Sequence, residues 1–337
     1  MISSLETWRL PEKGCLPHKQ DDPSPREPTM RAAARVRAPF RRGWLPMAVF
    51  AMLGLSVTAD ALLRIAPSAS LHYAPNRNFG PRGDYLPDQA GFNLADVSTL
   101  AQLDSLPAGV KGLVWVGQCD GATAQFLATV RPYIGNRKLF GFYLMDHPDP
   151  RSRAVTGYPS IPCTTQNLNA ESDWIHANAP GAKTFMLLMN LSSSATPWFD
   201  PSYNPAMLHV DLFGLDPYPC RSEFGGCDYN MIDRYLIAAE ARGVPRSRII
   251  PIYQAFGEGE WVDDGGGTYL LPTAEQEQQM LSRWGTLVGT PVFDYAYSWG
   301  RQKQDRSLES AADLRAVFAF HNGARFSSPM PPMITAP

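Results

Sequence analysis

Two segments of the sequence place a carboxyl group directly after an apolar run. The segment LFGFYLMDHPDP at 139–150 changes from an apolar run into Asp146 and His147, and the segment HVDLFGLDPYPC at 209–220 reaches Asp216 in the same way. Two carboxyl groups that face one cleft can act as the acid and the base or nucleophile of glycoside hydrolysis. The alternative is structural, because an aspartate near a proline often accepts backbone hydrogen bonds in a turn. We therefore treat Asp146 and Asp216 as a candidate catalytic pair.

Other apolar runs also end in side chains that suit a sugar ligand. Aromatic rings can stack on the C–H faces of a pyranose, and carboxylates, amides and imidazoles can bond its hydroxyl groups. The candidate substrate-binding residues are Asp120, His147, Asn190, Tyr218, Gln254, Trp261, Tyr297 and Trp299. Glu258, which closely follows Gln254, is a further candidate catalytic carboxyl.

These side chains follow apolar runs that have the character of buried strands. The runs cover 91–97, 112–117, 139–145, 184–190, 209–216, 249–254 and 292–299, with a weaker one at 71–75. Near-continuous apolar character is typical of strands buried on both faces, as in a parallel sheet. Helix-like segments cover 122–133, 167–178, 230–243, 273–288 and 307–322.

The alternation of strands and helices predicts an α/β fold, a single (β/α)8 barrel of the TIM type. A doubly wound sheet is the alternative, but no glycine-rich phosphate loop follows any of the strands. In a (β/α)8 barrel the functional groups lie at the carboxyl ends of the strands, which is where the candidate residues fall.

The strand endings YLMDHP, GLDPYP, PIYQAFG and YAYSWG resemble those of glycoside-hydrolase-type (β/α)8 barrels, over about 91–320. The resemblance implies a glycosidase that acts on a poly- or oligosaccharide. In one large group of these enzymes a carboxylic acid ends strand four and a glutamate ends strand seven. This sequence has His147 and Gln254 near those two positions.

Because of these two departures, three interpretations stay open. Asp146 and Asp216, which end strands four and six, can form the catalytic pair. Other glycosidase barrels place their carboxyl pair at the ends of these two strands. Glu258 or Glu260 can instead supply the second carboxyl from the loop after 254. The third interpretation is a catalytically inactive barrel that binds a glycan or a protein partner.

The first 61 residues have the features of an export signal. A basic stretch begins at Met30, an apolar run follows at about 45–57, and the sequence Ala-Asp-Ala ends at Ala61. This is the layout of a secretory signal peptide, so we expect cleavage near Ala61 and a secreted or periplasmic protein. A retained membrane anchor at 45–57 is the alternative. The predicted organisation is a leader and signal at 1–61, a barrel domain at 62–325 and a Pro-rich tail at 326–337.

The charge of the chain argues against a nucleic-acid partner. Of the 30 basic and 32 acidic residues, nine and six lie in 1–61, which leaves a net charge of about −5 for the remainder. No basic patch is present there, so we expect no nucleic-acid partner. The strand-end side chains and the resemblance imply a carbohydrate ligand, and we expect a monomeric protein. Contact with a membrane is expected only through an uncleaved signal.

Four cysteines remain after the predicted cleavage site, an even number in a presumed oxidising compartment. Cys220 and Cys227 enclose the short segment CRSEFGGC, which favours one disulfide between them. The second expected disulfide then joins Cys119 to Cys163, with four free thiols as the alternative. The cysteine spacings match no standard zinc motif, and we expect neither a metal nor another cofactor.

Overall fold

The computed structural model describes residues 71–150, 163–263 and 265–324. The chain divides into two compact units, Met1–Leu63 and Arg64–Pro337, and every described residue belongs to the second unit. The predicted signal at 1–61 and the tail at 326–337 lie outside the described residues. Within them, no helix has the length and apolar character needed to cross a bilayer.

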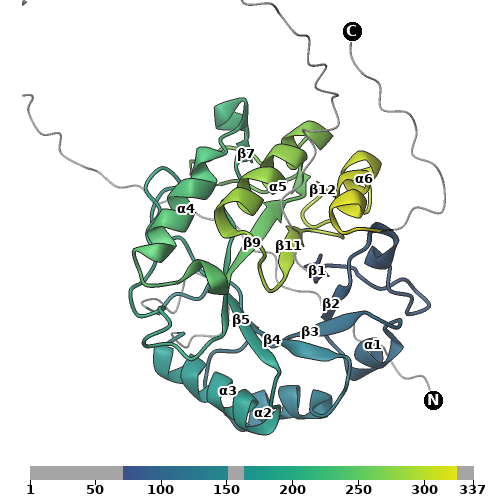
Figure 1. Cartoon of the computed structure of the whole chain (residues 1–337), viewed down its shortest axis with the longest axis vertical. Coiled ribbons are helices and arrows are strands. Elements are labelled where there is room, and N and C mark those ends of the chain that lie inside the picture. The colour runs from purple at the N-terminus through teal and green to yellow at the C-terminus, as the bar shows by residue number, and fades with distance from the viewer. Residues whose placement is uncertain (1–70, 151–162, 264, 325–337) are drawn as a thin grey trace, which may run out of the picture. The chain divides into compact units, whose positions relative to one another are not determined.

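Eight strands form a closed barrel, which confirms the predicted fold (Figure 1). Neighbouring strands are parallel throughout, in the order β1-β11-β9-β6-β5-β4-β3-β2. The barrel strands are β1 (His72–Tyr73), β2 (Leu94–Val97), β3 (Lys111–Trp115), β4 (Leu139–Met145), β5 (Lys183–Leu187), β6 (Leu212–Leu215), β9 (Ile249–Gln254) and β11 (Asp294–Tyr297).

Six α-helices connect or follow these strands, and several begin at a threonine N-cap. They are α1 (Leu100–Ser105), α2 (Ala124–Val130), α3 (Thr165–Asn178), α4 (Asn230–Glu240), α5 (Ala274–Val288) and α6 (Ala312–His321). Thr99 and Thr273 form complete capping boxes, which satisfy backbone N–H groups at the starts of α1 and α5. The β1–β2 connection has only the 3-10 helix η2 (Pro87–Ala90), and residues 188–211 between β5 and β6 form an irregular loop.

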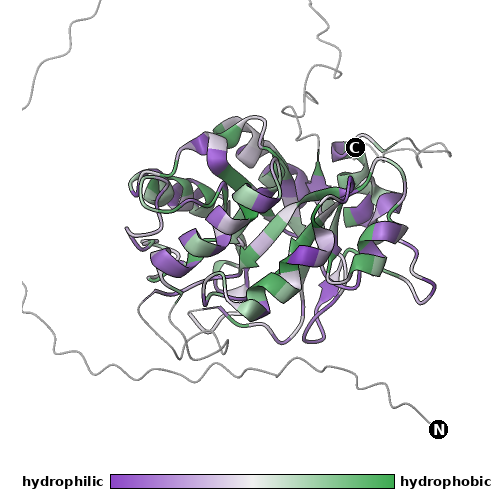
Figure 2. Ribbon diagram, turned by 90° about the horizontal axis from the view of Figure 1, so that it is seen from below, coloured by the Kyte–Doolittle hydropathy of each residue, from purple (hydrophilic) through white to green (hydrophobic). Residues whose placement is uncertain are grey.

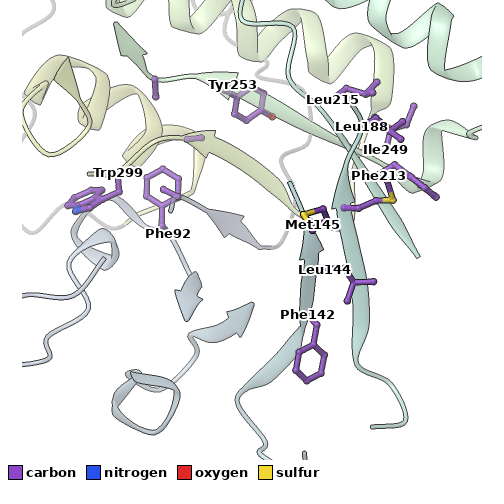
Figure 3. Packing of buried hydrophobic residues seen from close by; sticks show 14 of the residues in the cluster. Phe92, Phe142, Leu144, Met145, Leu188, Phe213, Leu215, Ile249, Tyr253 and Trp299 are labelled. Carbon is purple, nitrogen blue, oxygen red and sulfur yellow. The ribbon is translucent and has the colours of Figure 1, made fainter. Parts of the chain in front are cut away.

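Apolar side chains pack in two layers, one inside the barrel and one between the strands and the helices. The inner layer includes Tyr73, Phe185 and Tyr295, all nearly inaccessible to solvent. The outer layer contains Phe142 and Phe213 among many others (Figure 3). Hydrophilic residues lie mainly on the helices and loops (Figure 2). This packing fixes the strands, and therefore also fixes the residues that directly follow them.

Two short two-stranded sheets and both disulfides expected from the sequence add structure beyond the barrel. Strands β7 (Cys220–Arg221) and β8 (Gly226–Cys227) pair directly after β6 and carry the Cys220–Cys227 disulfide. Strand β10 (Phe256–Gly257), which follows β9, pairs with β12 (Arg306–Ser307), which follows β11. The Cys119–Cys163 disulfide ties the loop after β3 to the start of α3.

Candidate active site

The imidazole of His147 lies between two carboxyl groups at the carboxyl ends of β4 and β6. Its Nδ1 atom is 3.4 Å from Oδ1 of Asp146, and its Nε2 atom is 3.0 Å from Oδ2 of Asp216. The two nitrogens of an imidazole are about 2.2 Å apart, so the nearest carboxyl oxygens are separated by at most about 9 Å. Catalytic carboxyl pairs of glycosidases are roughly 5 to 9.5 Å apart.

The two carboxyl groups differ in their exposure to solvent. The side chain of Asp216 is 7% exposed, whereas that of Asp146 is 41% exposed. Burial raises the pKa of Asp216, and the nearby charge of Asp146 adds to the shift, although the contact with His147 opposes it. Asp216 therefore holds a proton to higher pH than an ordinary aspartate does.

Tyr143 holds the second carboxyl group in place. Its phenolic hydroxyl, which comes from the inner face of β4, donates a hydrogen bond of 3.1 Å to Oδ1 of Asp146. The ring of Tyr143 packs against Trp115 at 4.8 Å and Phe185 at 4.6 Å, so the hydroxyl has little freedom. From its place inside a strand, the sequence predicts Tyr143 as a core residue rather than a ligand contact. Its position three residues before Asp146, within the strand, is the signal that points to it.

Backbone geometry is unusual at both strand ends. His147 and Tyr218 have φ angles of 47° and 39°, in the left-handed region that non-glycine residues rarely adopt. Each is followed by a proline, Pro148 or Pro219, which also disfavours helical conformations in the preceding residue. Such conformations persist only where the surroundings impose them, and they are most frequent at functional sites.

Aromatic side chains surround the pair on the side of β6, β9 and β11. The ring of Tyr218 lies 5.0 Å from Phe256, 5.8 Å from Tyr269 and 5.8 Å from Tyr297. The hydroxyl of Tyr297 donates to Gln302 at 2.8 Å. Because Tyr218, Tyr269 and Tyr297 are only half-buried, part of this aromatic group is accessible from the mouth of the barrel.

Asp96 is a third carboxyl group, which was not predicted from the sequence, and it also faces the interior of the barrel. Asp96 lies on β2 between Ala95 and Val97, both of which pack in the outer layer. Its carboxyl group accepts a hydrogen bond from the backbone N–H of Asn76 at 3.2 Å and another from the hydroxyl of Tyr73. Burial raises the pKa of Asp96.

Two of the predicted binding residues lie in packed surroundings away from the pair. Gln254 is completely buried, and its amide group bonds the backbone N–H and C=O of Cys220 at 2.8 and 2.9 Å. Trp299 is 2% exposed and packs against Phe92 in the outer layer (Figure 3). The structure gives both residues a packing role and does not bring either one to Asp146 or Asp216.

The remaining predicted residues lie in the loops around the mouth. Asn190 accepts hydrogen bonds from Ser192 and Trp198 and thereby orders its own loop. Asp120 accepts a hydrogen bond from the hydroxyl of Thr123. These contacts orient the loops after β5 and β3.

Two residues of the loop after β9 contact basic side chains. Glu258 forms an ion pair of 3.0 Å with Arg306, and Glu260 is exposed. Lys303 lies over the ring of Trp261, with its Nζ atom 4.4 Å from the ring centre. Glu258 therefore contacts an arginine rather than either of the two aspartates.

One group in the described part of the chain combines histidine and carboxylate ligands closely enough for a metal ion. It comprises His72, Asp294 and His321, all buried, at the amino ends of β1 and β11 and the end of α6. Asp294 contacts His72 at 2.8 Å and His321 at 2.7 Å, and these contacts have hydrogen-bond geometry. The group joins the first strand, the last strand and the last helix, at the end of the barrel opposite to the mouth.

Comparison with known proteins finds similar structures but no similar sequence. No family model matches the chain, and no curated protein matches it. A chitinase from Rhizomucor miehei aligns with a TM-score of 0.46 and 13% identity, over 69% of this chain and 94% of that one. A fungal endo-β-N-acetylglucosaminidase of glycosyl hydrolase family 18 aligns with a TM-score of 0.45 and 12% identity, over 75% and 96%.

A chitinase-like agglutinin from Robinia pseudoacacia gives comparable values, with a TM-score of 0.45 and 12% identity over 75% of this chain and 99% of that one. The similarity extends over most of each of these structures and concerns the barrel fold. At these values it assigns neither an activity nor a residue role to this chain.

Proposed function

We propose that this protein is a glycoside hydrolase that cleaves a poly- or oligosaccharide at the mouth of the barrel. The observation that carries the proposal is the position of His147 between Asp146 and Asp216, which brings two carboxyl groups within the distance used by glycosidases. The accessible aromatic rings of Tyr218 and Tyr297 supply surfaces on which sugar rings can stack.

The two carboxyl groups have different roles in this proposal. Asp216, which is buried and has a raised pKa, donates its proton to the glycosidic oxygen as the bond to the anomeric carbon breaks. Asp146, more exposed to water, acts as the base or the nucleophile on the other side of that carbon. A water molecule supplies the hydroxyl group that the anomeric carbon finally bears, and its second proton restores the acid.

Mutation of the pair tests the proposal. We expect Asp216→Asn and Asp146→Asn each to lower turnover by about 100-fold or more while the melting temperature changes little. Asp173→Asn is the matched control, because Asp173 contacts His209 at 2.7 Å in an exposed pair on the outside of the molecule. Activity on a glycan panel that is equal in all three variants would remove the pair from the mechanism.

A binding protein without catalysis is the second candidate function, and the position of His147 itself supports it. An imidazole in contact with two carboxyl groups holds both in fixed positions, which a glycan-binding site can use without any bond cleavage. Under this alternative the wild-type protein binds an oligosaccharide that remains intact after prolonged incubation. Product analysis by mass spectrometry separates the two functions.

Export before folding is part of the proposal. Both disulfides, Cys119–Cys163 and Cys220–Cys227, support an oxidising compartment, as does the signal-like sequence that ends at Ala61. We expect a monomeric mature protein that begins near Leu62. Amino-terminal sequencing of the exported protein tests this, and an intact 45–57 segment in a membrane fraction would indicate an anchor instead.

A further inference from the structure

Asp96 is a carboxyl group without a cationic partner at the mouth of the barrel. It is half-buried, and its two hydrogen-bond donors, the hydroxyl of Tyr73 and the backbone N–H of Asn76, are both neutral. No ion pair of Asp96 occurs in the part of the chain that the structure describes. Keeping a partly desolvated carboxylate ionised is costly unless a positive charge lies close to it.

Asp96 shares the interior of the barrel with the two proposed catalytic carboxyl groups. Asp96 lies on β2, and Asp146 and Asp216 directly follow β4 and β6, which are alternate strands of the same barrel. Tyrosine rings link them: the ring of Tyr73, whose hydroxyl bonds Asp96, lies 4.8 Å from that of Tyr295, which lies 6.3 Å from that of Tyr297 beside Tyr218. Burial raises the pKa of Tyr295, and the charges of Asp146, Asp96 and Asp216 each raise it further.

Positive charge is scarce in these surroundings. Among the described residues, His147 is the one basic side chain seen in contact with the three carboxyl groups. The guanidinium of Arg221 lies over Tyr269 at 5.3 Å, but it is already paired with Asp263 at 3.0 Å. With Asp216 protonated as the proposed acid, His147 lies beside Asp146, and no basic side chain of the described residues pairs with Asp96.

We propose that Asp96 makes this site selective for sugars that carry a positive charge, that is, amino sugars with a free ammonium group. The ammonium group supplies the missing counter-charge beside Asp96, whereas an N-acetylated sugar supplies none and a uronic acid is repelled. This inference rests on the proposed function, because it assigns the substrate class of the same site.

Calorimetric titration of the folded protein with three oligosaccharides of equal length tests the proposal. The probes are a glucosamine oligomer, its N-acetylated counterpart and an oligogalacturonate, at pH 6. We expect the wild type to bind the glucosamine oligomer about tenfold more tightly than the N-acetylated one. The preference should shrink between 50 mM and 500 mM salt, because salt screens charge pairs that are open to solvent.

Asp96→Asn keeps the shape of the side chain and removes its charge. We expect this variant to lower the ratio of the two affinities at least fivefold, with a melting curve as cooperative as that of the wild type. Asp88→Asn is the matched control, because it changes the net charge equally at an exposed position in η2, and its ratio should remain that of the wild type. The salt titration needs no variant, so it tests the proposal even if Asp96→Asn folds poorly.

The outcomes separate this inference from the proposed function. Equal wild-type affinity for the charged and neutral oligomers overturns the role of Asp96, and so does an unchanged ratio in folded Asp96→Asn. If neutral glycans are nevertheless cleaved, the hydrolase proposal stands alone. Preferential binding of the glucosamine oligomer without cleavage of any glycan supports charge selection and rejects the hydrolase. Absence of binding to every probe rejects both.

Discussion

The Nε2 atom of His147 lies 3.0 Å from a carboxyl oxygen of Asp216. The side chain of Asp216 is 7% exposed, and this burial raises its pKa. The contact with His147 lowers the same pKa. The pKa of Asp216 is raised because burial and the charge of Asp146 outweigh the contact with His147. His147 therefore adjusts the pH at which Asp216 can serve as an acid.

Replacing His147 should shift the pH dependence of catalysis. Activity that needs protonated Asp216 is lost as the pH rises through the pKa of that group. Because His147 lowers this pKa, His147→Gln should move the alkaline limb of the kcat/KM profile to higher pH. His209→Gln, which alters an exposed histidine–aspartate pair, is the control. An alkaline limb that stays in place in His147→Gln would show that Asp216 is not the acid.

Tyr143→Phe should impair catalysis more than folding. The substitution removes the 3.1 Å hydrogen bond to Asp146 and keeps the ring that packs in the barrel. A hydrogen bond to a charged group contributes roughly 1.5–3 kcal/mol, so kcat/KM should fall by about tenfold or more. Tyr133→Phe is the control, since the ring of Tyr133 packs against Phe142 on the outer face of the same strand. Equal activity in the two variants would contradict a positioning role for Tyr143.

Asp294→Asn should reduce stability in a manner that depends on pH. Burial alone would raise the pKa of Asp294, but hydrogen bonds from His321 and His72 outweigh it and lower the pKa. A carboxyl group with a lowered pKa stabilises the fold above its unfolded pKa of about 3.9 and loses this contribution as the pH falls further. Asp294→Asn should therefore lower the free energy of unfolding by about 2 kcal/mol at pH 7.

The difference between Asp294→Asn and the wild type should narrow below about pH 4, because the carboxyl group of the unfolded chain then binds a proton that the folded wild type binds only at lower pH. Urea denaturation at pH 7 and at pH 3.5 measures both values. Asp313→Asn, at an exposed position in the first turn of α6, should match the wild type at neutral pH. A constant difference at both pH values would argue that the charge of Asp294 has no stabilising role.

The two disulfides should contribute unequally to stability. Cys119 and Cys163 are 44 residues apart, whereas Cys220 and Cys227 are seven apart. In the chain-entropy model the longer loop corresponds to about 4 kcal/mol and the shorter one to about 2.5 kcal/mol. Paired serine substitutions, compared by guanidinium denaturation, should rank in that order. The reverse order would indicate that the geometry of the folded state, and not loop entropy, decides the contributions.

The sequence predicted the barrel because its strands are buried on both faces. The predicted runs at 139–145 and 249–254 coincide with β4 and β9, and the predicted helical segment at 273–288 coincides with α5 and its N-cap Thr273. Continuous apolar runs and caps are local features that survive in any context, so they identify elements well. The loop between β5 and β6 leaves no comparable local trace.

The direction of single side chains was less predictable. Successive residues of a strand point to opposite faces, so an uncertainty of one residue decides between the mouth and the packing layer. Gln254 and Trp299 both lie at the end of a predicted run, yet both are buried among other groups. Asp96 presented the opposite difficulty, because a single carboxyl group inside the apolar run GFNLADV does not reveal that it faces the other two.

Barrel closure places a condition on the order in which this chain can fold. The hydrogen bond between His72 and Asp294 joins residues 222 positions apart, and β1 pairs with β11 only once nearly the whole barrel sequence is present. Contacts between residues this distant in sequence form late, because closing the long loop between them lowers the conformational entropy of the chain. A nascent chain of this kind keeps an open sheet edge until its last strand emerges. Because Asp146 and Asp216 follow strands that precede the last one, the mouth that they line is complete only after the barrel has closed.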